Sequence, residues 1–208
     1  MKWLFSLAAV LGVTYVVSLP FHPYPFSFVL KAMPVLLLAA ISLRLLSGRQ
    51  RVLYIIAMVG SAAGDVFLDM DRQLYLKHAL LSFLITQICY IVIFVKLRAI
   101  HKLSLPAKTF SYVAPIAVAI FLLYQFHPNT GTMWWPVVVY VACLTAMAIL
   151  AMQTGHSWIA LGGVLFMLAD AMIGINRFWL PFDASTYVIV STYLTAQLLI
   201  GYGLLLKR

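Results

Sequence analysis

The stretch Gly60-Ser-Ala-Ala-Gly64-Asp65-Val-Phe-Leu-Asp69-Met-Asp71 places three carboxylates within and just after an otherwise apolar segment. The whole chain contains only five acidic residues, so most of them lie here. A charged side chain inside a bilayer is costly, and such residues usually face the interior of a helical bundle and have a function. We therefore expect this stretch to carry part of a functional site.

The composition indicates a membrane protein. The chain has 208 residues, of which 64% are hydrophobic and 9% charged, and its mean hydropathy is +1.03. A water-soluble domain of this composition would expose far too much hydrocarbon. At about 20 residues per span, the length accommodates seven or eight helices with short connections. We predict an all-α integral membrane protein whose single transmembrane domain covers residues 1–208.

Hydrophobic runs separated by polar or proline-rich turns predict an eight-helix transmembrane bundle. Three prolines within residues 20–25 disfavour regular helix there, so we expect a loop. A polar turn is likewise expected at residues 127–132. The first run has no small-residue cleavage site, which favours a retained helix over a signal peptide. The predicted spans are residues 3–18, 26–46, 52–69, 74–95, 110–126, 134–152, 158–173 and 185–206.

The basic residues predict the orientation of the bundle. With the N-terminus inside, ten of the fourteen Lys and Arg residues fall at inner ends or in inner loops. This bias follows the positive-inside rule and predicts cytoplasmic N- and C-termini. It also explains the net charge of +9 without nucleic-acid binding, which we do not expect. The other four, among them Lys31, Lys77 and Arg177, map to the outer half.

All five acidic residues map to the outer half as well, and three charges there lie inside apolar runs: Lys31, Asp65 and Asp170. Asp65 and Asp69 are four residues apart, about 6 Å along a helix, so they share one helix face. Two carboxylates in a dry site do not both ionise readily, so we expect one of them to keep its proton and act as a donor. Asp170 offers a second acid from another helix.

Several polar residues near this layer have two interpretations that remain open. Lys31 is either a structural counter-ion or a phosphate ligand. Lys77 and Arg177 either extend to the outer headgroups or bind a lipid phosphate. Gln87 and Gln197 either bridge helices or take part in the site.

The histidine and glutamate contents argue against metal chemistry. Only His78, of five histidines, is predicted to lie near this layer, and the chain has no glutamate and no recognisable set of metal ligands. A G-x-S-x-G motif is also absent, which gives no support to a serine hydrolase. We expect neither a metal nor another cofactor. Cys89 and Cys143 lie within apolar runs and are read as core residues.

Two parts of the chain have similar sequence patterns. Gly64-Asp65 is followed in the next span by Thr86-Gln87, and Ala169-Asp170 is followed in the next span by Ala196-Gln197. The two pairs of spans are four spans apart, so the copies would run in the same direction as a parallel four-helix repeat. The ordinary similarity of apolar helices is the alternative.

The chain resembles the YhhN family of membrane lysoplasmalogenases over nearly its whole length. The resemblance is carried by Lys31, Gly64-Asp65-Val-Phe-Leu68, Phe83-x3-Gln87-x2-Tyr90-x3-Phe94, Ala169-Asp170 and Tyr193-Leu-Thr-Ala-Gln197-Leu-Leu-Ile200. Two positions depart from the family pattern. Ala32 stands where the family often has proline, and Gln87 stands where it often has histidine, which puts in doubt any role of that imidazole here.

The resemblance implies hydrolysis of the vinyl ether bond of lysoplasmalogens to a fatty aldehyde and glycerophosphocholine or glycerophosphoethanolamine. Such a reaction requires an acid, a carboxylate and a cationic phosphate site. We assign Asp65 and Asp170 as the catalytic acid and base, in either order, acting on a lysophospholipid among the membrane lipids. The compact chain suggests a bacterial inner membrane. The other implied site residues are Asp69 and Lys31, which would tune the pair, Tyr193 and Gln197, which would position substrate or water, and Lys77 or Arg177, which would meet the headgroup.

A small proton-coupled transporter is the alternative function. Intramembrane carboxylates and parallel repeats are also typical of that class. Transporters, however, usually interrupt helices at the site, whereas the prolines within these spans are limited to Pro34, Pro115 and Pro136. A third reading is a scaffold whose aspartates face a partner protein. The sequence indicates no oligomeric state.

Overall fold

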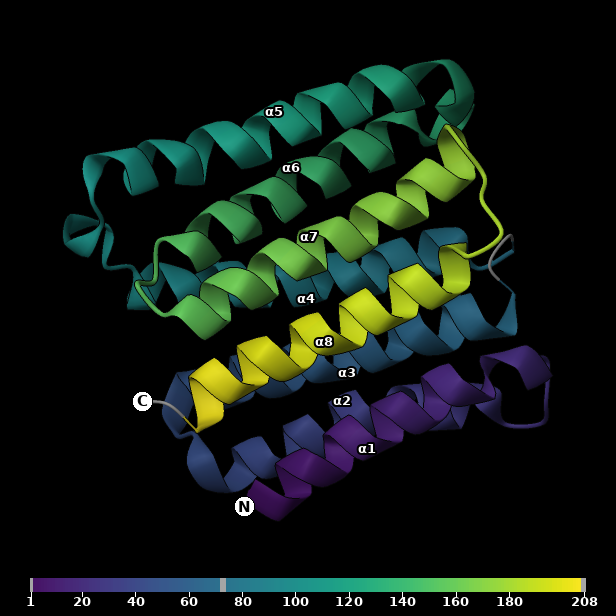
Figure 1. Ribbon diagram of the computed structural model, residues 1–208, viewed down its shortest axis with the longest axis horizontal. Helices are drawn as coiled ribbons and strands as arrows, with labels where there is room; N and C mark the ends of the chain where they lie inside the picture. The colour runs from purple at the N-terminus through teal and green to yellow at the C-terminus, as the bar shows by residue number, and fades with distance from the viewer. Residues whose placement is uncertain (1, 72–73, 207–208) are drawn as a thin grey trace. The chain divides into compact units, whose positions relative to one another are not determined.

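The computed structural model describes residues 2–71 and 74–206, and these residues form helices joined by short turns, without any β-strand (Figure 1). This confirms the all-α prediction. The helices are α1 (Lys2–Ser18), η1 (Leu19–Phe21), α2 (Ser27–Leu45), α3 (Gly48–Met70), α4 (Leu76–Leu97), η2 (Ile100–Lys102), α5 (Leu105–Thr130), η3 (Gly131–Met133), α6 (Trp134–Met152), α7 (Ser157–Phe178) and α8 (Ser185–Leu205).

Seven helical runs in the described part of the chain are long and apolar enough to cross a membrane. One of these runs, Leu105–Met152, contains α5, η3 and α6 together. The length and hydropathy of the runs agree with an integral membrane protein. The count of eight crossings and the cytoplasmic position of both termini stay predictions.

Two connections differ from those expected. The first two residues of the loop expected at residues 20–25 lie instead in a short 3-10 turn, η1, which has Pro20 near its start, where a missing N–H costs little. The turn expected at residues 127–132 is shorter than predicted, because α5 continues through Pro128 to Thr130 and the last two residues lie in η3. Pro128 lies close to the helix end, so it interrupts few of the helical hydrogen bonds.

Two helices also extend further than their apolar runs. α3 begins at Gly48 rather than near residue 52, and α7 continues to Phe178 rather than ending near residue 173. The added residues include Arg49, Arg51 and Arg177, and arginine is a good helix former. Hydropathy therefore marked the end of the apolar stretch and not the end of the helix.

The chain forms two compact units. One unit comprises the chain up to Ile93 with the last residues from Leu204, and the other runs from Phe94 to Gly203. The prediction of a single transmembrane domain stays a prediction. Below, these parts are called unit 1 and unit 2, and each is described by itself.

In unit 1, α1 packs on α2 and α2 packs on α3. Two glycines bring α3 close to α4. A Cβ atom on Gly60 would lie 2.9 Å from the carbonyl oxygen of Ser82, and one on Gly64 would lie 2.7 Å from the ring of Phe83. These separations leave no room for a methyl group, so the glycines set the approach of the two helices.

In unit 2, α5, α6 and α7 lie side by side in chain order (Figure 1). α7 meets α8 through Gly162, where a Cβ atom would lie 2.9 Å from the carbonyl oxygen of Ala196. Gly203 of α8 makes the reciprocal close approach, since its Cβ would lie 2.6 Å from Ile159. In both units, glycines thus allow close contact between the third and the fourth helix.

Candidate functional site

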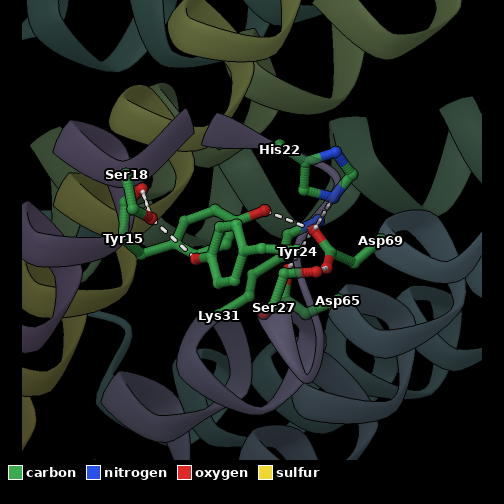
Figure 2. A network of polar contacts seen from close by, with 8 residues as sticks. All are labelled: Tyr15, Ser18, His22, Tyr24, Ser27, Lys31, Asp65 and Asp69. Atoms are coloured by element: carbon green, nitrogen blue, oxygen red, sulfur yellow. Dashed lines mark hydrogen bonds and ion pairs between the residues drawn. The ribbon is translucent and has the colours of Figure 1, made fainter. Parts of the chain in front are cut away.

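The first half of the candidate site is a buried ion pair in unit 1. Asp65 on α3 and Lys31 on α2 are 2% and 3% exposed, and Lys31 Nζ lies 4.0 Å from Asp65 Oδ1 (Figure 2). A buried carboxylate without a compensating charge would be strongly destabilising. The pair explains how two charged residues are tolerated inside apolar runs, and it supports the counter-ion interpretation of Lys31.

Asp69 lies one turn beyond Asp65 and is surrounded by hydrogen-bond donors. Its carboxylate accepts hydrogen bonds from the hydroxyl of Tyr15 and from Ser27 Oγ, the latter at 2.5 Å, and His22 Nε2 lies 3.5 Å away (Figure 2). The Asp69 side chain is only 4% exposed. Because the side chains that contact Asp69 come from α1, α2 and the connection between them, Asp69 joins three segments at one end of the unit.

The contacts of α2 with α3 include two side-chain pairs, one helical turn apart, which are called rungs below. Ser27 and Lys31 are one turn apart on α2, and they contact Asp69 and Asp65, which are one turn apart on α3. Both aspartates therefore lie on the face of α3 that meets α2, as their spacing of four residues predicted. This arrangement places one carboxylate against an ammonium group and the other against mostly neutral donors.

The prediction that only His78 lies near the carboxylates was wrong. His78 is exposed and makes ring contacts with Phe67 and Tyr75, with centroid distances of 5.4 and 5.9 Å. His22 instead reaches Asp69 from the connection between α1 and α2. The path of this irregular segment decides where its side chain lies, and no sequence spacing revealed it.

Local hydrogen bonds hold this connection in place. Ser18 Oγ donates to the carbonyl oxygen of Tyr15 at 2.8 Å and lies 2.7 Å from the Tyr24 hydroxyl (Figure 2). These contacts link the end of α1 to the segment that carries His22. The position of His22 at Asp69 is thereby supported from both sides.

The second half of the candidate site lies in unit 2. Asp170 on α7 is 6% exposed and accepts a hydrogen bond of 2.5 Å from the hydroxyl of Tyr140 on α6. On α8, the amide nitrogen of Gln197 lies 3.5 Å from the hydroxyl of Tyr193, whose ring packs on Phe166 at 5.8 Å. All these side chains except that of Phe166 bring polar groups into the apolar interior of the unit.

The remaining predicted site residues differ in how far they are buried in the protein. Gln87 on α4 is fully buried. Next to it, Thr86 Oγ1 donates to the carbonyl oxygen of Ala57 on α3 at 2.9 Å. Lys77 in the first turn of α4 and Arg177 in the last turn of α7 are both exposed. Exposure at helix ends suits cations that meet lipid headgroups.

The structure thus brings Lys31, Asp65 and Asp69 together in unit 1, and Tyr193 and Gln197 in unit 2. Asp65 and Asp170 belong to different units, and their convergence stays a prediction. Four residues in these contacts had not been singled out for the site: Tyr15, His22, Ser27 and Tyr140. Only Ser27 had a usable signal, since it precedes Lys31 by one helical turn.

Each half of the candidate site contains a carboxylate that is buried away from solvent. In unit 1 the Lys31 ammonium group lies 4.0 Å from Asp65, and in unit 2 the Tyr140 phenol donates a hydrogen bond to Asp170. No group of three or more His, Cys, Asp or Glu side chains suited to a metal occurs among residues 2–71 and 74–206. The arrangement suits proton transfer and the stabilisation of a positively charged intermediate.

The family match and the individual relatives of this chain agree with each other. The profile of the YhhN family matches residues 26–204. A protein named lysoplasmalogenase from Mycobacterium bovis is 32% identical over 185 residues, which cover 86% of this chain and 70% of that protein. Lysoplasmalogenase TMEM86A from Bos taurus is 30% identical over 164 residues, covering 74% of this chain and 65% of that protein. No solved structure matches the chain.

Proposed function

The chain belongs to the YhhN family, and on this basis we propose that it is a lysoplasmalogenase. Its substrate is a lysophospholipid that carries a vinyl ether chain. The products are a fatty aldehyde and glycerophosphocholine or glycerophosphoethanolamine. The names of the mycobacterial and mammalian relatives support this assignment at the level of the family.

The observation that carries the mechanism is that two buried carboxyl groups have different partners. Asp65 lies against the Lys31 ammonium group, and Asp170 accepts a hydrogen bond from Tyr140. Different surroundings let two carboxyl groups divide the roles of acid and base, as in glycosidases, whose transition state is also oxocarbenium-like. We assign Asp65 and Asp170 to this catalytic pair.

The reaction needs one proton donor, one proton acceptor and one water molecule. The acid protonates the outer carbon of the vinyl ether, which leaves an oxocarbenium-like cation on the adjacent carbon and oxygen. Water attacks that carbon while the base takes a proton from the water, which gives a hemiacetal. The hemiacetal then collapses to the aldehyde and the free glycerol hydroxyl, and the proton balance of the two carboxyl groups is restored.

The surrounding residues act on this pair or on the substrate. Lys31 and Asp69 set the charge near Asp65. Tyr193 and Gln197 position water or substrate near Asp170, and Gln87 contributes a buried amide where the family often has an imidazole. Lys77 and Arg177 are exposed at helix ends and meet the phosphate of the headgroup.

The proposal extends to the architecture in the membrane. Eight spans with both termini in the cytoplasm, in a bacterial inner membrane, agree with the distribution of basic residues. A parallel repeat of four helices is supported by one shared feature. In each unit the third helix carries the aspartate, and the second helix carries its partner, Lys31 in one case and Tyr140 in the other.

The test is aldehyde release by the purified protein in detergent, with a vinyl ether lysophospholipid as substrate. Asp65→Asn and Asp170→Asn each lower kcat by roughly 100-fold or more, as expected for the loss of an acid or base. Asp183→Asn, in the exposed turn before α8, is the matched control and keeps wild-type turnover. Full activity of both site variants contradicts the catalytic pair. The protein in detergent has no second compartment, so a transporter would release no aldehyde there. Absence of turnover in this assay therefore favours the transporter.

A further inference from the structure

An open groove lies on unit 2 where α5 turns into α6. Its volume is about 760 Å³, within the range of roughly 300–1,000 Å³ that is usual for small-molecule sites. The groove is bounded by the last three turns of α5, the first turns of α6 and the residue that follows α7. Its aromatic and polar lining includes Tyr124, Gln125, His127, Asn129, Trp135 and Trp179.

The aromatic rings of the groove present large accessible faces. Tyr124 is 77% exposed and Trp135 is 72% exposed. Two further rings are held by edge-to-face contacts, Trp134 against His127 at 4.7 Å and Trp179 against Phe121 at 5.5 Å. A ligand therefore meets several indole and phenol rings whose positions are partly fixed in advance.

The charge pattern indicates the class of ligand. Among the described residues, the lining contains no Lys, Arg, Asp or Glu, so a cation in the groove would be bound by ring faces. Aromatic surroundings of this kind suit a quaternary ammonium group, which has no N–H to hydrogen-bond. Arg177 is exposed two residues before Trp179, and a guanidinium group binds phosphate well. The aromatic lining and the nearby guanidinium group together suit a zwitterionic ligand that carries a phosphate and a quaternary ammonium group.

One hydrogen bond holds the end of α7, which carries Arg177, next to the groove. Asn129 Nδ2 of α5 donates to the carbonyl oxygen of Phe178 at 2.7 Å. Phe178 lies between Arg177 and Trp179 in the chain, and Asn129 itself lines the groove. The end of α7 is therefore tied to the end of α5 at this site.

The position of the groove along the membrane normal suits a lipid headgroup. The chain reverses direction at η3, so this end of the α5–α6 hairpin lies at a membrane surface, where Trp and Tyr are enriched. Trp134 precedes Tyr140 by six residues, about 9 Å along α6, and Tyr140 donates to Asp170. In an extended lysoplasmalogen about ten bonds, or roughly 12 Å, separate the vinyl ether carbon from the ammonium nitrogen.

We propose that this groove binds the phosphocholine headgroup of the substrate and makes the enzyme prefer choline over ethanolamine lysoplasmalogens. The inference rests on the proposed function, and it adds a specificity site to it. Tyr124, Trp135 and Trp179 hold the trimethylammonium group, and Arg177 binds the phosphate.

Binding is measured with a saturated alkyl ether lysophosphocholine, which has no vinyl bond to cleave, and with its ethanolamine counterpart. The wild-type protein in detergent binds the choline compound about ten times more tightly. Tyr124→Leu and Trp135→Leu each raise its Kd by roughly five- to tenfold, in line with the loss of one cation–π contact. Arg177→Gln weakens both compounds, whereas Arg177→Lys retains more of the affinity.

Kinetics separate specificity from general damage. Tyr124→Leu and Trp135→Leu raise KM for the choline lysoplasmalogen by a similar factor and leave kcat unchanged for both substrates. Phe110→Leu, which removes an exposed ring of α5 outside the groove, changes neither constant.

Two outcomes overturn different claims. Equal affinity for the two ether lipids, or variants that bind like the wild type, overturns the groove proposal and leaves the hydrolase proposal standing if aldehyde is released. Absence of aldehyde release from both lysoplasmalogens overturns the hydrolase proposal, while the binding measurement still decides whether the groove takes phosphocholine.

Discussion

Lys31 and Asp65 form an ion pair of 4.0 Å between two neighbouring helices, and both side chains are almost completely buried. Neither residue would be stable alone in an apolar helix, because a buried unpaired charge is costly. Each therefore accounts for the presence of the other. Their pairing also means that a change at one residue alters the electrostatic environment of the proposed catalytic carboxylate.

Lys31→Met is expected to lower the free energy of unfolding by about 3–5 kcal/mol, since it leaves the Asp65 carboxylate buried without its counter-ion. The double variant Lys31→Met with Asp65→Asn removes both charges and recovers part of that loss, which a double-mutant cycle measures by unfolding in detergent. Lys77→Met, at an exposed position, is the matched control. If the control loses as much stability as Lys31→Met, the ion pair is not a stabilising contact.

Asp69→Asn is expected to affect stability more than chemistry. The amide keeps the shape of the side chain but weakens the charge-assisted hydrogen bonds from Tyr15 and Ser27 and the contact with His22. A loss of about 1–3 kcal/mol in unfolding free energy follows, with kcat falling far less than in Asp65→Asn. A fall in kcat as large as that of Asp65→Asn would instead make Asp69 a direct participant in the reaction.

Gly64→Ala is expected to lower the unfolding free energy by about 1–3 kcal/mol, because the new methyl group would lie 2.7 Å from the Phe83 ring. The experiment is thermal unfolding in detergent, with Gly64→Ala combined with Phe83→Leu as the compensating variant. The smaller leucine relieves the clash and restores part of the melting temperature. An unchanged melting temperature in Gly64→Ala alone shows that the α3–α4 contact is looser than described.

Tyr54→Phe is expected to leave stability unchanged or to raise it by about 1 kcal/mol. The Tyr54 hydroxyl is buried, and it has no hydrogen-bond partner among the described residues, so its removal relieves a desolvated polar group. Tyr15→Phe is the contrasting variant, since it loses the hydrogen bond to Asp69 and is destabilised. Equal destabilisation of both variants indicates that a buried water molecule pairs with Tyr54.

The sequence predicted the helices better than their ends. Long apolar runs leave little alternative to membrane-spanning helix, because every backbone polar group must be satisfied within the segment. The ends were missed where polar residues continue the helix, as at Arg177, or where proline lies near its last turn, as at Pro128. Hydropathy reports the environment of a residue, and helix ends depend on local hydrogen bonding as well.

The candidate site was predicted where a residue type was unusual in its surroundings. Lys31, Asp65 and Asp170 stood out because charges are rare in apolar spans. Tyr15, Ser27 and Tyr140 did not, since hydroxyl-bearing side chains are common in such helices. Their contacts with carboxylates depend on how separate helices pack, and no spacing within one helix records that.

The rungs between α2 and α3 also bear on how the protein enters the membrane. Insertion of a single helix with a lysine or aspartate in its apolar stretch is unfavourable, by up to about 2.5–3.5 kcal/mol per residue at the helix centre on translocon scales. The pairing of Lys31 with Asp65 offsets both penalties only when the two helices are side by side. We therefore expect α2 and α3 to leave the translocon together as a hairpin, with the ion pair formed during biogenesis rather than after it.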